Sequence, residues 1–225
     1  MLIESRAVGP FFKNGFVLAC ERTREAVIVD PGDEVADLVA LVESRQLVVR
    51  QILLTHAHID HVTGVGPAKR AFGAPIWLHQ DDLFLYERVG QQAEMFGLEV
   101  ELPLPPVDHF YDGSGFAFGD YAVSVHHTPG HCPGGVCLAV TGPDLPVPHL
   151  FVGDTLFAGS IGRTDLPGGD YDVLMRAITG VLFPLGDEAI VHPGHGPDTT
   201  IRRERETNPF LLEYLSGGTD ATRRL

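Results

Sequence analysis

The chain has 225 residues and a formal net charge of −14, with 30 Asp and Glu against 16 Lys and Arg, and 44% of its residues are hydrophobic. This composition is ordinary for a globular enzyme with a substantial core, in one large domain or two small ones. The acidic balance argues against a nucleic-acid or anionic-membrane surface, because both require basic patches.

The first part of the chain predicts strands followed by a helix. Strands are expected at Leu2 to Val8, Phe16 to Cys20 and Ala26 to Asp30, and a Pro-Gly pair stops the third. Asp33 is suited to cap the helix that follows, because a side-chain oxygen at that position can accept a free backbone N–H. The apolar residues at helical spacing are Val35, Leu38, Val39 and Val42.

An apolar run, Ile52 to Leu54, then leads into the sequence THAHIDH at residues 55–61. A short helical segment ending near Gly73 and a strand from Pro75 to Leu78 follow it. This alternation of elements predicts layered α/β structure. The next segment, Gln80 to Gly119, is broken by prolines and has no clean period, so we expect an irregular excursion there.

The second half returns to strands. A helix is predicted from Asp170, as its cap, to about Phe183. No repeat or low-complexity linker divides the chain, so we expect a single domain over residues 1–225. The predicted strands are Tyr121 to Val125, Val136 to Thr141, His149 to Val152 and Ala189 to His192.

Metal-ligating residue types are dense directly after the apolar run at 52–54. His56 and His58 are two apart, and in near-extended chain such residues point the same way, so both can reach one ion. Asp60 and His61 then turn elsewhere. This density is hard to explain without a metal.

Three later strands each run into a short loop that holds another ligand type. His131 follows the strand that begins at Tyr121, Asp154 follows the one from His149, and His195 follows the one from Ala189. Functional residues gather at such carboxyl ends. Five histidines and two carboxylates are too many for one tetrahedral structural zinc, but they suit two ions that share a carboxylate.

Short motifs along the whole chain resemble those of the metallo-β-lactamase fold, and others are similar to its glyoxalase II branch, the hydroxyacylglutathione hydrolases. The first set is THAHIDH (55–61), TPGH (128–131), GD (153–154) and PGHG (193–196), and the second is VDPG (29–32), GRTD (162–165) and NPF (208–210). The resemblance implies a four-layer αββα sandwich with metals at one edge of the sheets.

Carried over position by position, the resemblance also implies the ligand set. One metal would be held by His56, His58 and His131, the other by Asp60, His61 and His195, and Asp154 would bridge them. We expect two divalent ions, with zinc favoured and iron or manganese as alternatives.

Charge then predicts the chemistry. Water between two cations roughly 3.5 to 4 Å apart has a pKa near about 7, so a metal-bridging hydroxide would be the nucleophile. Asp60 would orient it, which makes Asp60 and Asp154 the catalytic carboxylates. Because a thiolate leaves without a proton donor, we expect hydrolysis of a glutathione thioester of the S-lactoylglutathione type.

The chain resembles the short form of the branch, without the helical C-terminal domain that supplies much of the glutathione site.

Some residues have alternative interpretations. Arg163 is the candidate contact for anionic glutathione, or else it forms a purely structural ion pair with Asp165. Cys132 is expected to pack rather than to ligate, and Asp30 either hydrogen-bonds a ligand histidine or stops its strand. The histidines not expected to be ligands are His79, His109, His126, His127, His149 and His192.

Other functions stay open. A persulfide dioxygenase would use one iron held by His58 or His56, by His131 and by Asp154. Lactone or β-lactam hydrolysis shares the nucleophile with thioester hydrolysis. A binding module with purely structural metals is a further alternative.

The compartment follows from cysteine usage and hydropathy. Cys20, Cys132 and Cys137 are odd in number and lack zinc-finger spacing, which favours a reducing environment. The N-terminal stretch MLIESRAVGP has no apolar segment of signal-peptide length. The longest stretch without charged residues, Tyr121 to Pro143, is interrupted by histidines, glycines and prolines. We therefore expect a cytoplasmic protein that binds neither membrane nor nucleic acid.

Overall fold

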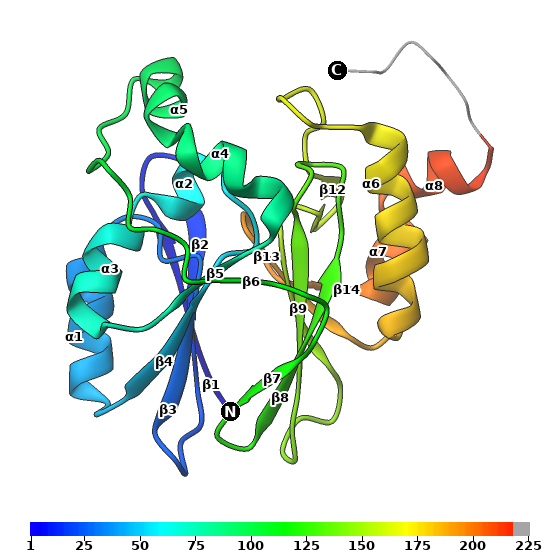
Figure 1. Cartoon of the computed structure of the whole chain (residues 1–225). Coiled ribbons are helices and arrows are strands. Elements are labelled where there is room, and N and C mark those ends of the chain that lie inside the picture. The colour runs from blue at the N-terminus through cyan, green and yellow to red at the C-terminus, as the bar shows by residue number, and fades with distance from the viewer. Residues whose placement is uncertain (218–225) are drawn as a thin grey trace.

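Two six-stranded sheets pack face to face, with helices on both outer faces, in a computed structural model that describes residues 1–217 (Figure 1). The strand order is β1-β2-β3-β4-β5-β6 in the first sheet and β14-β13-β10-β9-β8-β7 in the second. This is the four-layer αββα sandwich expected from the sequence.

In the first sheet, the strands β1, β2 and β3 are antiparallel, whereas β3 to β6 run parallel to one another. The carboxyl ends of β3, β4 and β5 therefore lie at one edge. The bounds are β1 (Leu2–Val8), β2 (Lys13–Ala19), β3 (Glu25–Val29), β4 (Val48–Leu53), β5 (Ile76–Leu78) and β6 (His109–Phe110).

In the second sheet, β8 and β10 are both antiparallel to β9, and β13 is parallel to β10. Hence β8, β10 and β13 share one direction and end at the same edge. The bounds are β7 (Phe116–Phe118), β8 (Tyr121–His127), β9 (Val136–Thr141), β10 (His149–Gly153), β13 (Ile190–Pro193) and β14 (Thr199–Thr200), with a separate hairpin of β11 (Leu156–Phe157) and β12 (Ser160–Ile161).

Helices cover each sheet from outside. Figure 1 shows α1 and α3 beside the first sheet and α6, α7 and α8 beside the second. No helix among residues 1–217 is long and apolar enough to cross a membrane. The bounds are α1 (Val35–Ser44), α2 (Ile59–Val62), α3 (Val65–Phe72), α4 (Leu83–Glu87), α5 (Val89–Phe96), α6 (Tyr171–Ala177), α7 (Ile201–Thr207) and α8 (Pro209–Leu215), with 3-10 turns at Gln80–Asp82 and Phe183–Leu185 and a π turn at Ile178–Leu182.

Alternation along the strands produces three apolar layers. In β2, Phe16 and Leu18 pack between the two sheets, while Val17 and Ala19 pack under the helices of the first sheet. A third layer lies between the second sheet and α6 to α8. Because both faces of the central strands are covered, they are apolar on both faces.

The expectation of an irregular excursion over Gln80 to Gly119 is wrong for its first half, where α4 and α5 lie. Their inward residues Leu85, Val89 and Ala93 recur every four positions and are buried in the layer beside the first sheet. The prolines that interrupt the pattern come only later. Residues 97–108 contain neither helix nor strand, as expected.

Of the two predicted helix caps, one is correct and one is wrong. Asp170 caps α6 as expected, since its side chain accepts the Val173 N–H at 2.9 Å. The cap position of α1 belongs to Glu34 rather than Asp33, and no side chain accepts a hydrogen bond there. The chain turns through left-handed residues at 30, 32 and 34 after β3, so the helix begins one residue later than predicted.

We predict that Asp170→Ala lowers the free energy of unfolding by about 1 kcal/mol, because the Val173 N–H loses its acceptor. Urea denaturation measures this difference. Asp33→Ala is the matched control and is expected to cost less, because Asp33 caps nothing. Equal losses in the two variants would contradict the cap assignment.

Candidate metal centre

Side chains from four strand ends meet at one edge of the sandwich. They come from both sheets, so the centre lies where the two sheets face each other. The segment after β4 supplies His56 and His58, α2 supplies Asp60 and His61, and the ends of β8, β10 and β13 supply His131, Asp154 and His195.

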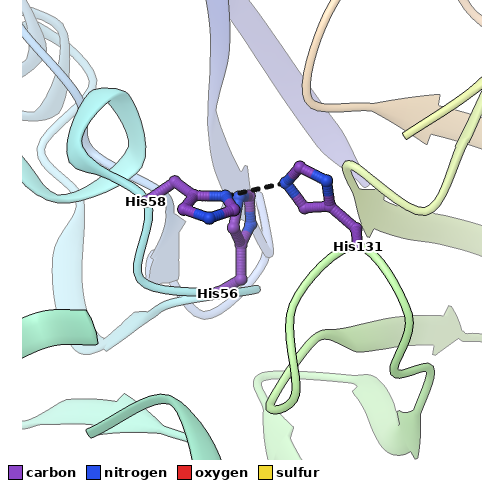
Figure 2. A group of neighbouring side chains, drawn as sticks. All are labelled: His56, His58 and His131. Atoms are coloured by element: carbon purple, nitrogen blue, oxygen red, sulfur yellow. Dashed lines mark hydrogen bonds between the residues drawn. The ribbon is translucent and has the colours of Figure 1, made fainter. Parts of the chain in front are cut away.

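His56, His58 and His131 form a first group, seen in Figure 2. His58 Nδ1 lies 2.8 Å from His131 Nε2. The ring of His56 is 4.9 Å from that of His58 and 5.0 Å from that of His131, centroid to centroid. One donor atom from each residue lies within 4.8 Å of the others, which is the spacing around a single ion.

Asp60, His61 and His195 form a second group, and Asp154 lies between the two. Asp60 Oδ2 is 3.1 Å from His195 Nε2 and 3.7 Å from His61 Nε2. Asp154 Oδ1 is 3.4 Å from His61 Nε2, whereas its Oδ2 is 3.7 Å from His131 Nε2. This one carboxylate therefore reaches both groups.

Buried polar atoms without partners point into this centre. Among residues 1–217, His56 Nε2, His61 Nε2 and Asp154 Oδ1 are buried and make no hydrogen bond. An unsatisfied buried polar atom costs about 1–3 kcal/mol, so three at one place require a common partner. The donor set of imidazole nitrogens and carboxylate oxygens fits divalent transition metals.

Asp30 organises one histidine from each group. Its Oδ2 lies 2.9 Å from His61 Nδ1 and accepts the Thr55 hydroxyl at 2.6 Å. Thr55 Oγ1 in turn lies 3.1 Å from His56 Nδ1. With both Nδ1 atoms donating to this chain of acceptors, the Nε2 atoms of His56 and His61 are left free for an ion. The expected hydrogen bond between Asp30 and a candidate ligand histidine is present, and the histidine is His61.

Backbone carbonyls orient two further histidines in the same way. His131 Nδ1 lies 2.8 Å from the Arg163 carbonyl oxygen, and His195 Nδ1 lies 3.1 Å from the Phe11 carbonyl oxygen. Each ring therefore donates through Nδ1 and presents Nε2 to the centre.

Asp82 is a support that the sequence did not indicate. It is fully buried, and its carboxylate accepts the Ala57 N–H at 2.9 Å and the Gly134 N–H at 2.6 Å. It thus joins the loop of His56 and His58 to the loop of His131. Cys132 Sγ donates to the same carboxylate at 3.2 Å, which agrees with a packing role for that cysteine.

Gln92 and Asn14 are further supports that appear only in three dimensions. Gln92 of α5 accepts the Ile59 N–H at 3.0 Å, which fixes the start of the helix that carries Asp60 and His61. Asn14 of β2 donates to the Gly196 carbonyl at 2.8 Å and so fastens the loop of His195. No local pattern marks these residues, because their partners are far away in sequence.

Burial and charge divide the histidines into two kinds. Burial lowers the pKa of His58 to about 3, and burial together with the charge of His61 holds that of His56 well below its usual range. Burial would also lower the pKa of His61 and His195, but neighbouring carboxylates raise it to about 9 and about 10. Without an ion, His61 and His195 are therefore charged at neutral pH, whereas His56 and His58 are not.

The carboxylates respond in the opposite direction. Burial alone would raise the pKa of Asp154. The positive charge of His61 and the hydrogen bond from His195 instead hold the pKa of Asp154 well below its usual range. The same balance lowers the pKa of Asp60. Both side chains are thus available as anionic ligands.

Arg163 lies beside the centre, but its side chain already has a partner. The guanidinium makes two hydrogen bonds to Asp165, at 2.7 and 2.6 Å, and the pair is partly exposed to solvent rather than buried. Only its backbone carbonyl contacts the centre, through His131.

A further group with ligating side chains, His79, Asp81 and His127, lies outside the centre. The rings of His79 and His127 stack at 4.1 Å with an interplanar angle of 10°. Their in-plane lone pairs therefore do not point at a common position, and this group does not have the arrangement of the other two.

Comparisons with known proteins place this geometry in a family. The metallo-beta-lactamase superfamily profile matches residues 8–195. The hydroxyacylglutathione hydrolase GloC of Haemophilus influenzae is 37% identical over 202 residues, which cover 89% of this chain and 93% of that protein.

Two solved structures are similar over nearly their whole length. The BLEG-1 B3 metallo-beta-lactamase has 37% identity and a TM-score of 0.84, covering 93% of this chain and 99% of its own. TTHA1623, in a di-iron-bound form, has 41% identity and a TM-score of 0.81, covering 92% and 100%. With its sandwich fold and its clustered donors, the chain belongs to the metallo-β-lactamase superfamily and is a metal-dependent hydrolase.

Proposed function

We propose that the protein is a binuclear hydrolase of glutathione thioesters. The observation that carries this proposal is the position of Asp154, whose carboxylate lies 3.7 Å from His131 of the first group and 3.4 and 3.5 Å from His61 and His195 of the second. In this assignment, His56, His58 and His131 would hold one cation, Asp60, His61 and His195 would hold the second, and Asp154 would be shared between them. Zinc is the expected metal, with iron or manganese as alternatives, and the di-iron form of TTHA1623 supports the iron alternative.

Bound cations of this kind supply a water molecule that ionises near pH 7 and polarise the substrate carbonyl. The residues of the chain do the rest. Asp60, whose side chain is only 15% exposed, would accept a hydrogen bond from the attacking water and orient it. The buried supports Asp30 and Asp82 keep the donors in place, so that little reorganisation is needed during the reaction.

The leaving group of the substrate decides between a thioester and an amide. Among residues 1–217, the imidazoles of the centre are assigned to cations and the guanidinium of Arg163 is paired, so no side chain is assigned as a proton donor. A thiolate needs none, whereas an amine does. Together with the name of the GloC relative, this supports a thioester substrate over an amide.

The anionic glutathione part of the substrate requires a cation nearby. Arg163 is our candidate, because its backbone carbonyl already contacts His131 and its guanidinium is half exposed. A substrate carboxylate would have to compete with Asp165 for the same planar fork.

β-Lactam hydrolysis is the second candidate function, favoured by the 37% identity to the BLEG-1 enzyme. It shares the nucleophile but breaks an amide bond. The persulfide dioxygenase alternative needs only one iron and would leave Asp60, His61 and His195 without a role, although they converge within 4.8 Å.

We predict that the zinc-loaded protein hydrolyses S-lactoylglutathione with multiple turnovers and hydrolyses a cephalosporin much more slowly. Absorbance assays of thioester loss and of lactam opening measure both on one preparation. Oxygen uptake with glutathione persulfide is the control for the dioxygenase reaction. A fully loaded protein that cleaves no glutathione thioester would overturn the proposal.

The ligand assignment predicts a pattern of metal loss. His58→Ala should lose one ion, His195→Ala should lose the other, and Asp154→Ala should weaken both, because it removes the shared carboxylate. Metal analysis after dialysis against a weak chelator measures the content per chain. Full metal content in Asp154→Ala would show that the carboxylate is not a bridge.

Raised pKa values predict that metal uptake releases protons. His61 and His195 have pKa values of about 9 and about 10 without an ion, so both bind protons at pH 7 that a cation must displace. Apparent affinity of the second group should rise with pH, by up to about tenfold per pH unit for each proton displaced, and level off above pH 10. Calorimetry in two buffers of different ionisation enthalpy counts the protons, and a pH-independent affinity would contradict the assignment.

A further inference from the structure

Lys13, at the start of β2, is a buried charge for which the proposed mechanism has no use. It is one of only two lysines in the chain, and its exposed fraction is 0%. It forms no ion pair with any carboxylate of residues 1–217, and its Nζ donates instead to the backbone carbonyl of Asp30. Removing an ammonium group from water without a carboxylate partner is costly, so its retention calls for a specific role.

The carbonyl that Lys13 holds belongs to a strained residue. Asp30 is not glycine, yet its φ is 47°, in the left-handed region. Such a conformation costs about 1–3 kcal/mol and persists only where surrounding contacts enforce it. The Asp30 N–H is fixed by the Leu53 carbonyl at 2.9 Å, and the Asp30 carbonyl is fixed by Lys13.

The chain leaves room for this lysine through two glycines. A Cβ on Gly32 would lie 2.6 Å from Lys13 Cε, and a Cβ on Gly15 would lie 3.2 Å from Lys13 Nζ. Gly32 also has a positive φ of 56°, which larger residues rarely adopt. The segment is therefore shaped to admit the lysine side chain beside Asp30.

We propose that Lys13 is a positioning residue for the metal centre, acting through Asp30. Its ammonium group holds the Asp30 backbone in the left-handed conformation that aims the carboxylate at His61 and, through Thr55, at His56. The inference rests on the proposed ligand set and deepens it, because it assigns the group that keeps one histidine of each half-site in its binding orientation.

A purely electrostatic role of Lys13 would change the metal affinity in the opposite direction from a positioning role. Burial lowers the pKa of Lys13 only to about 8, so the side chain is charged at pH 7. If it acted only as a positive charge near the centre, its removal would relieve repulsion and tighten metal binding. If it holds Asp30, its removal loosens the histidines and weakens metal binding. The sign of the change therefore distinguishes the two roles.

The test is the affinity of the purified full-length chain for Zn²⁺ at pH 7, measured by competition with a chromophoric chelator. Lys13→Met, which keeps an unbranched side chain that is one atom shorter, should weaken binding by about 10- to 100-fold, the usual effect of losing a group that orients ligands. Lys69→Met is the matched control, since Lys69 Nζ also donates to a carbonyl, that of Ala74 at 3.1 Å. Unchanged or tighter binding in Lys13→Met would overturn the proposal.

Two further variants test whether Lys13 acts through Asp30, and they distinguish this action from a loss of affinity caused by misfolding. Lys13→Gln keeps an N–H donor without the charge and should recover part of the affinity lost in Lys13→Met. In an Asp30→Ala background, Lys13→Met should cause no further loss, because the carboxylate that Lys13 keeps in position is gone. Equal affinities of the Met and Gln variants, or additive losses in the double variant, would refute action through Asp30.

A spectroscopic measurement needs no bound metal. The ¹⁵N chemical shifts of the imidazole nitrogens in the metal-free protein report whether His56 carries its proton on Nδ1. Lys13→Met should mix the tautomers of His56, while Lys69→Met should not, and an unchanged His56 spectrum would count against the proposal. If the wild type binds two zinc ions but cleaves no thioester, the proposed substrate fails and this inference stands.

Discussion

The structure depends on holding seven polar side chains against one another at a buried edge, where their mutual repulsion and loss of water would otherwise drive them apart. Two carboxylates and two protonated imidazoles, His61 and His195, offset each other there without an ion. Cations can replace those protons with the same sign of charge. The sandwich makes this possible because strand ends from two sheets are rigid on both sides of the centre.

Rigidity at that edge comes from buried or partly buried polar supports on different elements. Asp30 follows β3, Asp82 precedes α4, and Gln92 lies in α5, yet each fixes a backbone or ring of the ligand loops. Each carboxylate has several donors, which is the condition under which a buried charge is tolerated. The candidate ligands themselves can therefore stay incompletely satisfied, as His56 Nε2 does.

Sequence patterns predicted which donor side chains would meet better than they predicted the residues that support them, for a physical reason. Apolar strands that end in His or Asp are local signals, and parallel strand ends must meet at one edge, so His131 and Asp154 could be placed together. Asp82 and Gln92 lie in the segment expected to be irregular, and their partners are 25 or more residues away. The left-handed turn after β3 was missed as well, because it depends on Lys13 and on packing rather than on local preference.

Motifs that resemble the glyoxalase II branch have structural roles around the centre. In GRTD, a Cβ on Gly162 would lie 1.8 Å from the Asp154 carbonyl oxygen, and the Arg163 carbonyl orients His131. In NPF, Asn208 donates to the Ser160 carbonyl at 3.0 Å and to the buried Glu204, which accepts the Gly159 N–H at 2.8 Å. Through these contacts both motifs fix the hairpin beside the candidate metal centre. They support the shape of the centre, and the identity of the substrate has to be argued from the leaving group and from the surface around the ions.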